Sequence, residues 1–271
     1  MDLTGIGGIW PASLTPFAPD GRIDEAALAA HLAQLAGVPG VRALVVNGHA
    51  GEATSLDAAA AGADALLLFP PLLFANGAEA RPEMALAFVK EVAAATPLPI
   101  VLFQLSRASG LGYATPLLAR LVAEVPQIIA VKEGSDIPTV YEDNLRALRQ
   151  GGRPVTVLTT NNGWLFASLS YGADGILSGI GSVASDILSE MFAASQAGDI
   201  ATARAANDRL LPLARVFYRR PGLDMHNRMK TALHLLGRLP HPDPRPPLLP
   251  ITAAERAEIR AALVAAGLLA A

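Results

Sequence analysis

The sequence predicts an α/β protein of the (β/α) barrel type, in which parallel strands are covered by helices. Short apolar runs alternate with longer amphipathic segments, which is typical of a parallel sheet with a helix after each strand. The chain has 271 residues, 52% of them hydrophobic, so it can bury the core of one barrel. Helical patterns continue without strands after the last apolar run. We therefore expect a barrel over 1–185 and a helical extension packed on it over 186–271.

Seven apolar runs are expected to form buried strands, because each is short and bounded by glycine, proline or polar residues. They are 9–15, 43–48, 65–70, 99–104, 128–132, 155–160 and 175–180. A closed barrel of this type has eight strands, and the interval between the second and third runs is too short for a full repeat. The sequence thus predicts a (β/α)8 TIM-barrel type that lacks one βα repeat, with about seven core strands and a distorted wall at that seam.

The segments between these runs have helical periodicity and begin with acidic, threonine or proline start signals. Outer helices are predicted at 24–35, 82–95, 115–124 and 137–149. After the last strand, helices are predicted at 186–197, 200–217, 225–236 and 253–265, and the proline-rich stretch LPHPDPRPPLLP separates the last two.

Composition argues against several classes of partner and cofactor. The formal net charge is −3, with no basic or acidic block, so we expect neither nucleic acid nor an anionic membrane as a partner. The chain has no cysteine, which excludes disulfides and thiolate chemistry, and we find no ligand spacing for a metal and no nucleotide-binding motif. We expect a cytoplasmic protein without a cofactor, because we find neither a basic segment followed by an apolar run at the N-terminus nor an apolar stretch of about 20 residues.

Lys132 is the first candidate catalytic residue. It follows the apolar run IIAV, at the C-terminal end of a predicted strand, where barrel enzymes build their active sites. Burial there would lower the pKa of the amine and allow it to attack a ketone carbon, forming an imine. The alternative is a strand-end lysine whose amine reaches solvent. Only three of the 21 basic residues are lysine.

A glycine-bracketed turn, NGHAGE over 47–52, follows the second predicted strand. Its backbone N–H groups could hold a substrate carboxylate. Equally, the two glycines could serve only a tight turn between strand and helix.

Several motifs together resemble the dihydrodipicolinate synthase and N-acetylneuraminate lyase family of class I Schiff-base aldolases. They are PASLTPF, GHAGE, VKEGS, GADGILSG and NRMKTALHLLG, in the order of that family and over nearly the whole chain. The resemblance implies that Lys132 forms the imine. It also implies that the backbone of Gly48, Ala50 and Gly51 binds the carboxylate of pyruvate or a longer 2-oxo acid.

The chain departs from this family where acid and base chemistry is expected. The family has a tyrosine in a YNxP-type motif, and the matching segment LFQLSRASG places Phe103 at this catalytic position. Phenylalanine cannot transfer a proton, so we expect that dihydrodipicolinate synthesis itself is not the activity. His49 is the candidate replacement acid or base, or else a loop residue that bonds to carbonyl groups. Arg107 lies one position before the family's second-substrate arginine.

Further candidates follow the later strands. We predict that six of these residues contact substrate, only because they lie at the C-terminal ends of predicted strands. They are Thr160, Ser178 and Gly179, together with Thr159, Asn161 and Asn162. The polar residues of HNRMK over 226–230 lie on a predicted helix with core spacing, so we expect them on a solvated or interface face. The LFPPLLFANG segment favours subunit contact, and we expect a homo-oligomer, either a dimer or a tetramer.

These observations lead to two alternative functions. The first is a Schiff-base lyase, an aldolase or dehydratase, acting on pyruvate or a 2-keto-3-deoxy sugar acid. The second is a catalytically impaired relative that binds a 2-oxo acid or serves as a structural or regulatory subunit.

Overall fold

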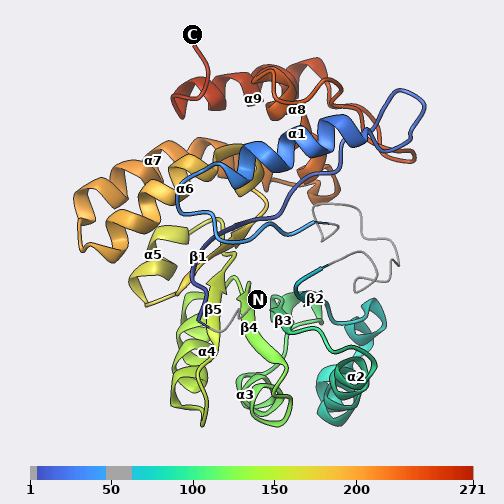
Figure 1. The fold of residues 1–271 in the computed structure, drawn as a ribbon, viewed down its shortest axis with the longest axis vertical. Helices are drawn as coiled ribbons and strands as arrows, with labels where there is room; N and C mark the ends of the chain where they lie inside the picture. Colours follow the sequence, from blue (N-terminus) through green and yellow to red (C-terminus); the bar gives the residue numbers. More distant parts are fainter. Residues whose placement is uncertain (1–4, 47–62, 271) are drawn as a thin grey trace. The chain divides into compact units, whose positions relative to one another are not determined.

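The computed structural model describes residues 5–46 and 63–270. Contacts between Cα atoms divide the chain into two compact units. Figure 1 colours the ribbon along the sequence, from the N-terminus to the C-terminus. Unit 1 comprises Met1–Gly7, Ser55–Asn161 and Ala167–Gly175, and unit 2 comprises Gly8–Thr54, Asn162–Phe166 and Ile176–Ala271.

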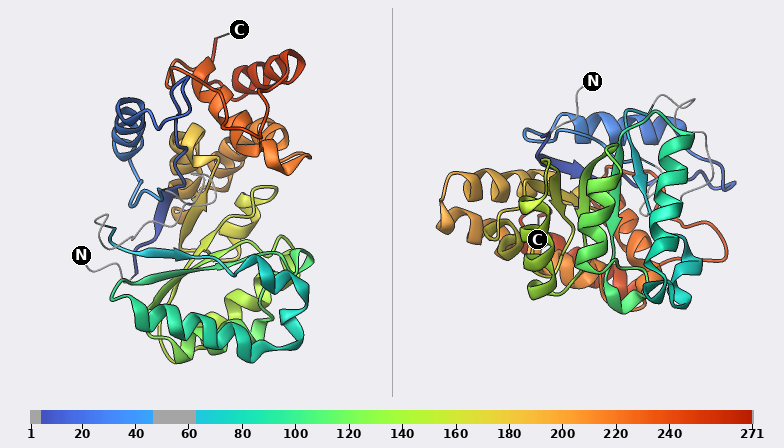
Figure 2. Two further views of the ribbon diagram at one scale, coloured as in Figure 1. Left: turned by 90° about the vertical axis from the view of Figure 1, so that its right-hand side faces the viewer. Right: turned by 90° about the horizontal axis from the view of Figure 1, so that it is seen from below.

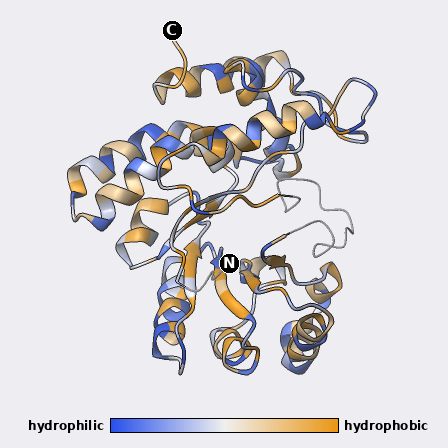
Figure 3. Cartoon of the chain, in the orientation of Figure 1, coloured by the Kyte–Doolittle hydropathy of each residue, from blue (hydrophilic) through white to orange (hydrophobic). Residues whose placement is uncertain are grey.

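Unit 1 is built on four parallel strands in the order β2-β3-β4-β5. Their bounds are β2 Leu66–Leu68, β3 Ile100–Gln104, β4 Ile128–Glu133 and β5 Thr156–Thr159. Every residue of β3 is buried, as expected for a strand that has neighbours on both edges and helices against one face. In Figure 3 the strands of unit 1 are mainly orange, whereas the helices beside them carry both colours.

Three helices lie side by side against one face of this sheet (Figures 1 and 2). They are α2 Pro82–Ala95, α3 Thr115–Glu124 and α4 Pro138–Gln150, and each has a proline in its first turn. Proline suits this place because the first N–H groups of a helix have no partner within it. Short 3-10 helices occupy Leu72–Asn76, Ala78–Ala80 and Arg107–Ser109 in the loops.

Unit 2 contains β1 Gly8–Pro11 beside β6 Gly175–Ser178, of which Gly175 is assigned to unit 1. Its helices are α1 Glu25–Ala36, α6 Gly181–Gln196, α7 Ile200–Phe217, α8 Met225–Leu235 and α9 Ala253–Ala265. Helix α6 packs on β1 and α7, and α9 packs on α7 and α8. A short helix, α5 Leu165–Ser170, and a 3-10 turn, Gly222–Asp224, complete the described elements.

The second predicted strand, at 43–48, is not assigned as a strand in the described part of the chain. The segment pairs with β1 only through isolated parallel bridges, Ile9 to Val41 and Ala12 to Val45. The reason is Pro11, which has no N–H to donate to the neighbouring segment. The Arg42 N–H donates to the Ile9 carbonyl, and the Val45 N–H donates to the Pro11 carbonyl at 3.0 Å, so the segment at 41–45 has one residue more than β1 between the two bonds. Residues 5–46 and 63–270 thus hold six assigned strands rather than seven.

The structure confirms an α/β architecture of parallel strands and helices with a helical C-terminal region. Helices α2, α3, α7 and α9 have the predicted bounds. The division of the chain at residue 185 into barrel and extension stays a prediction.

Candidate active site

Strand β4 presents Lys132 and Glu133 to opposite faces of the sheet, because side chains alternate along a strand. Lys132 is in register with Phe103 on β3 and with Leu158 on β5. Residues in register on neighbouring strands point to the same face. Accordingly, the Lys132 Nζ lies 4.1 Å from the centroid of the Phe103 ring.

The Lys132 amine is shielded from solvent, with only 5% of the residue exposed. Burial lowers its pKa from 10.5 to about 7, since the ammonium form loses its hydration. The face of the Phe103 ring favours the ammonium and acts in the opposite direction, but a cation–π contact is weaker than full desolvation. Near neutral pH, therefore, a substantial fraction of the amine is unprotonated and nucleophilic.

The surroundings of the amine within unit 1 are apolar. The Phe103 ring meets Phe69 edge to face, with the centroids 5.1 Å apart. Gly134 follows Glu133, and a Cβ on it would lie 2.8 Å from the Thr160 Cγ2 and 3.2 Å from the Phe103 Cε2. The structure thus brings Lys132, Phe103 and Thr160 into one neighbourhood at the ends of β3, β4 and β5, and glycine at 134 permits this close packing.

The opposite face of β4 carries a buried carboxylate that the sequence did not single out. Glu133 is fully buried and accepts hydrogen bonds from the Asn144 Nδ2 at 2.9 Å, the Asn161 Nδ2 at 3.1 Å and the Ser135 N–H at 3.3 Å. Burial raises the pKa of Glu133, while these donors act against the rise. The signal in the sequence was a carboxylate next to Lys132 in an apolar strand, since such a group requires donors.

Asn161 was predicted to contact substrate, which stays a prediction, and in the structure its side chain supports the end of β4. Its side chain donates to Glu133 and its Oδ1 accepts from the Asp136 N–H at 2.9 Å. Asp136 has a positive φ of 59°. The amide therefore stabilises the unusual turn that follows β4.

Ser178 and Gly179 lie in unit 2, at the end of β6. The Ser178 hydroxyl bonds to the Asn162 Oδ1 and lies 3.3 Å from the Tyr218 hydroxyl, which also accepts from the Ile180 N–H at 3.0 Å. A Cβ on Gly179 would meet the Tyr218 Oη and Met229 Cε at 3.4 Å. Burial raises the pKa of Tyr218 to about 12. Tyr218, one of four tyrosines in the chain, carries no signal in the sequence that links it to this strand end.

The glycine-bracketed turn lies outside the described residues. This concerns Gly48, His49, Ala50 and Gly51. Their predicted roles stay predictions.

The polar cluster on α8 corrects one expectation. Asn227, Arg228 and Lys230 are each at most 1% exposed, rather than on a solvated face. Arg228 donates to the carbonyls of Arg219 and Pro221 and lies 3.3 Å from Glu255, and the Lys230 Nζ lies 4.2 Å from the Phe17 ring centroid. The aliphatic parts of the Arg228 and Lys230 side chains are buried, while the charged group of Arg228 donates to carbonyls and that of Lys230 lies over an aromatic ring. The spacing of apolar residues along the helix does not reveal these contacts.

Two further findings concern the described residues. No group of three or more histidine, aspartate or glutamate side chains in 5–46 and 63–270 is arranged to hold a metal ion. Each helix in the same ranges is too short or too polar to span a membrane.

Sequence comparison identifies relatives along most of the chain. Residues 55–266 match the profile of the dihydrodipicolinate synthetase family. A 4-hydroxy-tetrahydrodipicolinate synthase of Corynebacterium aurimucosum is 32% identical, and covers 94% of this chain and 92% of its own length. The enzyme of the same name from Kineococcus radiotolerans is 33% identical, with 98% and 95% covered.

Solved structures show the same fold. YagE, a prophage protein of the dihydrodipicolinic acid synthase family from E. coli K12, solved in complex with pyruvate, has a TM-score of 0.87 at 22% identity, with 97% and 99% of the two chains covered. The dihydrodipicolinate synthase of Thermotoga maritima has a TM-score of 0.84, also at 22% identity, with 97% and 99% covered. The predicted TIM-barrel type is thereby confirmed. With the family profile and the relatives above, the chain belongs to the dihydrodipicolinate synthetase family.

Proposed function

We propose that this protein is a class I lyase that forms a Schiff base between Lys132 and a small 2-oxo acid such as pyruvate or a 2-keto-3-deoxy sugar acid. The observation that carries the proposal is the buried Lys132 amine at the end of β4, with a pKa lowered to about 7. Family membership supports the same chemistry, and one structural neighbour is described in complex with pyruvate.

The proposed chemistry begins with the neutral amine. The Nζ lone pair attacks the C2 carbonyl carbon, and the carbinolamine loses its oxygen as water to leave an iminium. The iminium accepts an electron pair from C3, and a 2-keto-3-deoxy sugar acid then has two routes. A base removes the C4 hydroxyl proton and the C3–C4 bond breaks to an aldehyde and an enamine, or a base removes a C3 proton and the C4 hydroxyl is protonated and leaves as water. We propose that the backbone of Gly48, Ala50 and Gly51 holds the substrate carboxylate, and that Thr160, Ser178 and Gly179 contribute to substrate binding.

Proton transfer is the step for which this chain differs from the family pattern. The Phe103 ring beside the amine has no proton to give, so we propose that His49 serves as the acid or base. We also propose that dihydrodipicolinate synthesis itself is not the activity, although relatives carry the name of that synthase.

A second candidate is a family member that binds a 2-oxo acid without turnover, or acts as a structural or regulatory subunit. The specific observation in its favour is again Phe103, whose ring lies 4.1 Å from the amine at the place of the family's tyrosine. Binding without an imine, or an imine without release of product, would favour this candidate.

The test is trapping of the imine with borohydride in the presence of pyruvate, read by intact mass and peptide mapping. The chain has only Lys90, Lys132 and Lys230, so an adduct can be assigned without ambiguity. We expect one adduct on Lys132 in the wild type and in Lys90→Arg, and none in Lys132→Arg. An adduct on Lys90 or Lys230 instead would refute the assignment. A folded protein with no adduct from pyruvate or from 2-keto-3-deoxy sugar acids would favour the second candidate.

We further propose that the protein is a homo-oligomer. Leu72 and Leu73 are 81% and 71% exposed at neighbouring positions in the loop before α2, where a subunit contact was predicted. Sedimentation velocity of the wild type and of Leu72→Ser/Leu73→Ser distinguishes the cases. Dissociation of the double variant supports the contact, and an unchanged oligomer places the interface elsewhere.

A further inference from the structure

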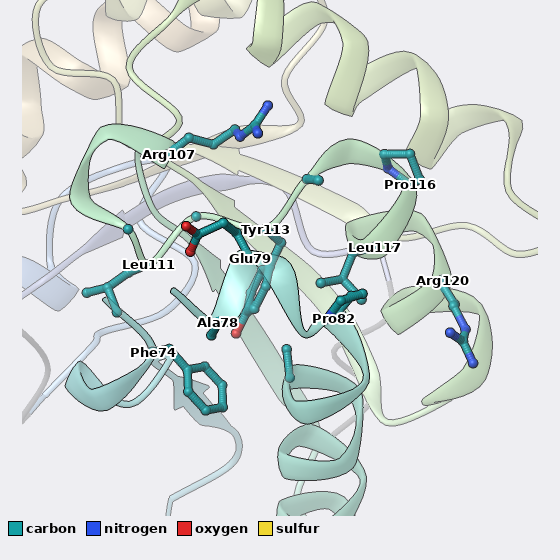
Figure 4. Close-up of a pocket in the computed structure, with 14 residues that line it drawn as sticks. Phe74, Ala78, Glu79, Pro82, Arg107, Leu111, Tyr113, Pro116, Leu117 and Arg120 are labelled. Atoms are coloured by element: carbon teal, nitrogen blue, oxygen red, sulfur yellow. The ribbon is translucent and has the colours of Figure 1, made fainter. Parts of the chain in front are cut away.

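A cavity of about 370 Å³ in unit 1 contains none of the proposed catalytic residues (Figure 4). Its walls come from the loop and 3-10 turns before α2, from the start of α2 and from the loop that leads from β3 into α3. Most of the lining is apolar, including Phe74, Leu111 and Leu117. The volume lies in the range of small-molecule sites, about 300 to 1,000 Å³.

One buried polar group in this lining has no partner. Only 4% of Tyr113 is exposed, and its hydroxyl makes no hydrogen bond within the described part of the chain. In Figure 4 the Tyr113 ring extends among the lining side chains, whereas the Arg107 and Arg120 guanidinium groups lie at two edges of the cavity. An unsatisfied buried hydroxyl is uncommon, because it loses its bonds to water without replacement.

One cation at the edge of the cavity is available to a ligand. Arg107 makes no side-chain hydrogen bond or ion pair with any described residue, whereas Arg120 is already bonded to Glu124. Glu79 also lines the cavity and has no described partner, so Arg107 and Glu79 are the two charged lining residues left unpaired in the described part of the chain. Arg107 is the cation available to a ligand, and guanidinium groups bind carboxylates well.

The wall that carries Tyr113 is held in place before any ligand arrives. The Gln104 side chain donates to the Tyr113 carbonyl at 2.9 Å and accepts from its N–H at 3.1 Å. Two positions along, the Thr115 hydroxyl donates to the Asn144 Oδ1 at 2.7 Å. A preformed wall lowers the entropic cost of binding, because little has to be ordered.

We propose that this cavity binds a small amphipathic monocarboxylic acid. The carboxylate is bound by Arg107, the apolar body lies against Phe74, Leu111 and Leu117, and an acceptor atom at the far end of the body receives the Tyr113 hydroxyl proton. The site is separate from Lys132 and does not depend on the proposed Schiff-base chemistry.

Calorimetric titration with 4-methoxyphenylacetate, phenylacetate and 4-methoxyphenylacetamide tests each part of the proposal. We expect Tyr113→Phe to weaken binding of the methoxy acid roughly fivefold and to leave phenylacetate unchanged, because only the former offers an acceptor to the hydroxyl. Arg107→Gln is expected to weaken both acids about tenfold, without effect on the amide. Ala78→Leu fills the cavity and should abolish binding of all three.

Two controls separate this site from the imine site and from misfolding. Lys132→Arg should bind the methoxy acid as the wild type does, and Ala78→Leu should still give the pyruvate adduct if Lys132 is the nucleophile. Tyr113→Phe removes a hydroxyl that has no partner, so its unfolding midpoint should not fall. Absence of binding at millimolar acid, or binding that none of the three cavity variants alters, overturns the proposal.

Discussion

At Lys132, two features of the surroundings act on the pKa of one amine in opposite directions. Burial lowers the pKa to about 7, and the Phe103 ring, 4.1 Å away, stabilises the ammonium. The amine must be neutral to attack a carbonyl carbon. The pH dependence of imine formation therefore reports directly on this balance.

We predict that the rate of adduct formation rises with pH through a midpoint near 7 and is level above it. Below the midpoint the amine is protonated and cannot attack. Phe103→Leu removes the ring and should move the midpoint to lower pH. The measurement is the rate of borohydride-trapped adduct between pH 5 and 9, and a midpoint near 10, as for an exposed lysine, would contradict the prediction.

Phe103→Tyr is predicted to increase proton transfer on the bound substrate. The hydroxyl would restore the side chain that the family pattern has beside the lysine, and a positioned acid or base contributes about 100-fold or more to such a step. We expect deuterium exchange at the pyruvate methyl group, followed by NMR, to be at least about tenfold faster. Phe69→Tyr, which adds a hydroxyl to the other ring of the pair, is the matched control and should show no comparable gain.

At the scale of elements, β4 is fixed by a network of hydrogen bonds on the face opposite the amine. Glu133 accepts from Asn144 on α4 and from Asn161 after β5, so one carboxylate connects three elements. The network lies one residue from Lys132. It therefore positions the strand end without contacting the amine.

Asn144→Ala is predicted to lower the free energy of unfolding by about 1 to 3 kcal/mol, because it leaves a buried carboxylate oxygen without its donor. Glu142→Gln, an exposed change on the same helix that removes the ion pair with Arg146, should alter it by less than about 1 kcal/mol. Urea unfolding of both variants provides the comparison. An equal effect of the two would show that the network adds no stability.

Elements with clear start signals could be predicted from the sequence, and irregular ones could not. Helix α2 begins at Pro82, and helix α3 begins at Thr115, directly before Pro116, both as predicted. Helix α6 begins at Gly181 rather than at residue 186, but Ala184 is non-helical and kinks it, so the segment after the kink begins close to the predicted start. The six-residue α5 has no start signal and was not predicted.

The candidate site shows the same limit. Lys132 could be chosen as a candidate from the sequence, because it lies at the C-terminal end of a predicted strand, where proteins of this fold class build their active sites. The partners of Glu133 and the Tyr218 hydroxyl beside Ser178 could not, because they come from residues distant in sequence. Long-range pairs of this kind require the tertiary structure.

At the scale of the whole molecule, the alignments to relatives are longer than this chain. The alignments to the two relatives run over 305 and 314 residues, more than the 271 of this chain. The relatives therefore contain residues that have no counterpart here, as expected for a chain that lacks one repeat. The wall beside that interval lies outside the described residues.

Global stability is predicted to fall in mild acid because of His31 on α1. The ring is 1% exposed, neither nitrogen has a partner in the described part of the chain, and burial, with the charge of Arg238, lowers its pKa to about 4. The unfolded chain takes up a proton below about pH 6.5, whereas the folded protein does so only near 4. Protons thus favour unfolding, and stability is lost as pH falls through this window.

The expected loss is on the order of 3 kcal/mol between pH 7 and 4. His31→Leu keeps an apolar group at this position and removes the titration. The measurement is the difference in unfolding free energy between wild type and variant across this range. A difference that does not change with pH would contradict the assignment.

The neutral amine by which we propose that Lys132 acts as a nucleophile also exposes the protein to chemical damage. Cyanate, which accumulates in aged urea solutions, carbamylates amines only in their unprotonated form. At neutral pH an ordinary exposed lysine is almost wholly charged, whereas a substantial fraction of the Lys132 amine is neutral. The residue proposed to carry the chemistry would thus be open to carbamylation at neutral pH, and samples for the unfolding experiments should be prepared in freshly deionised denaturant.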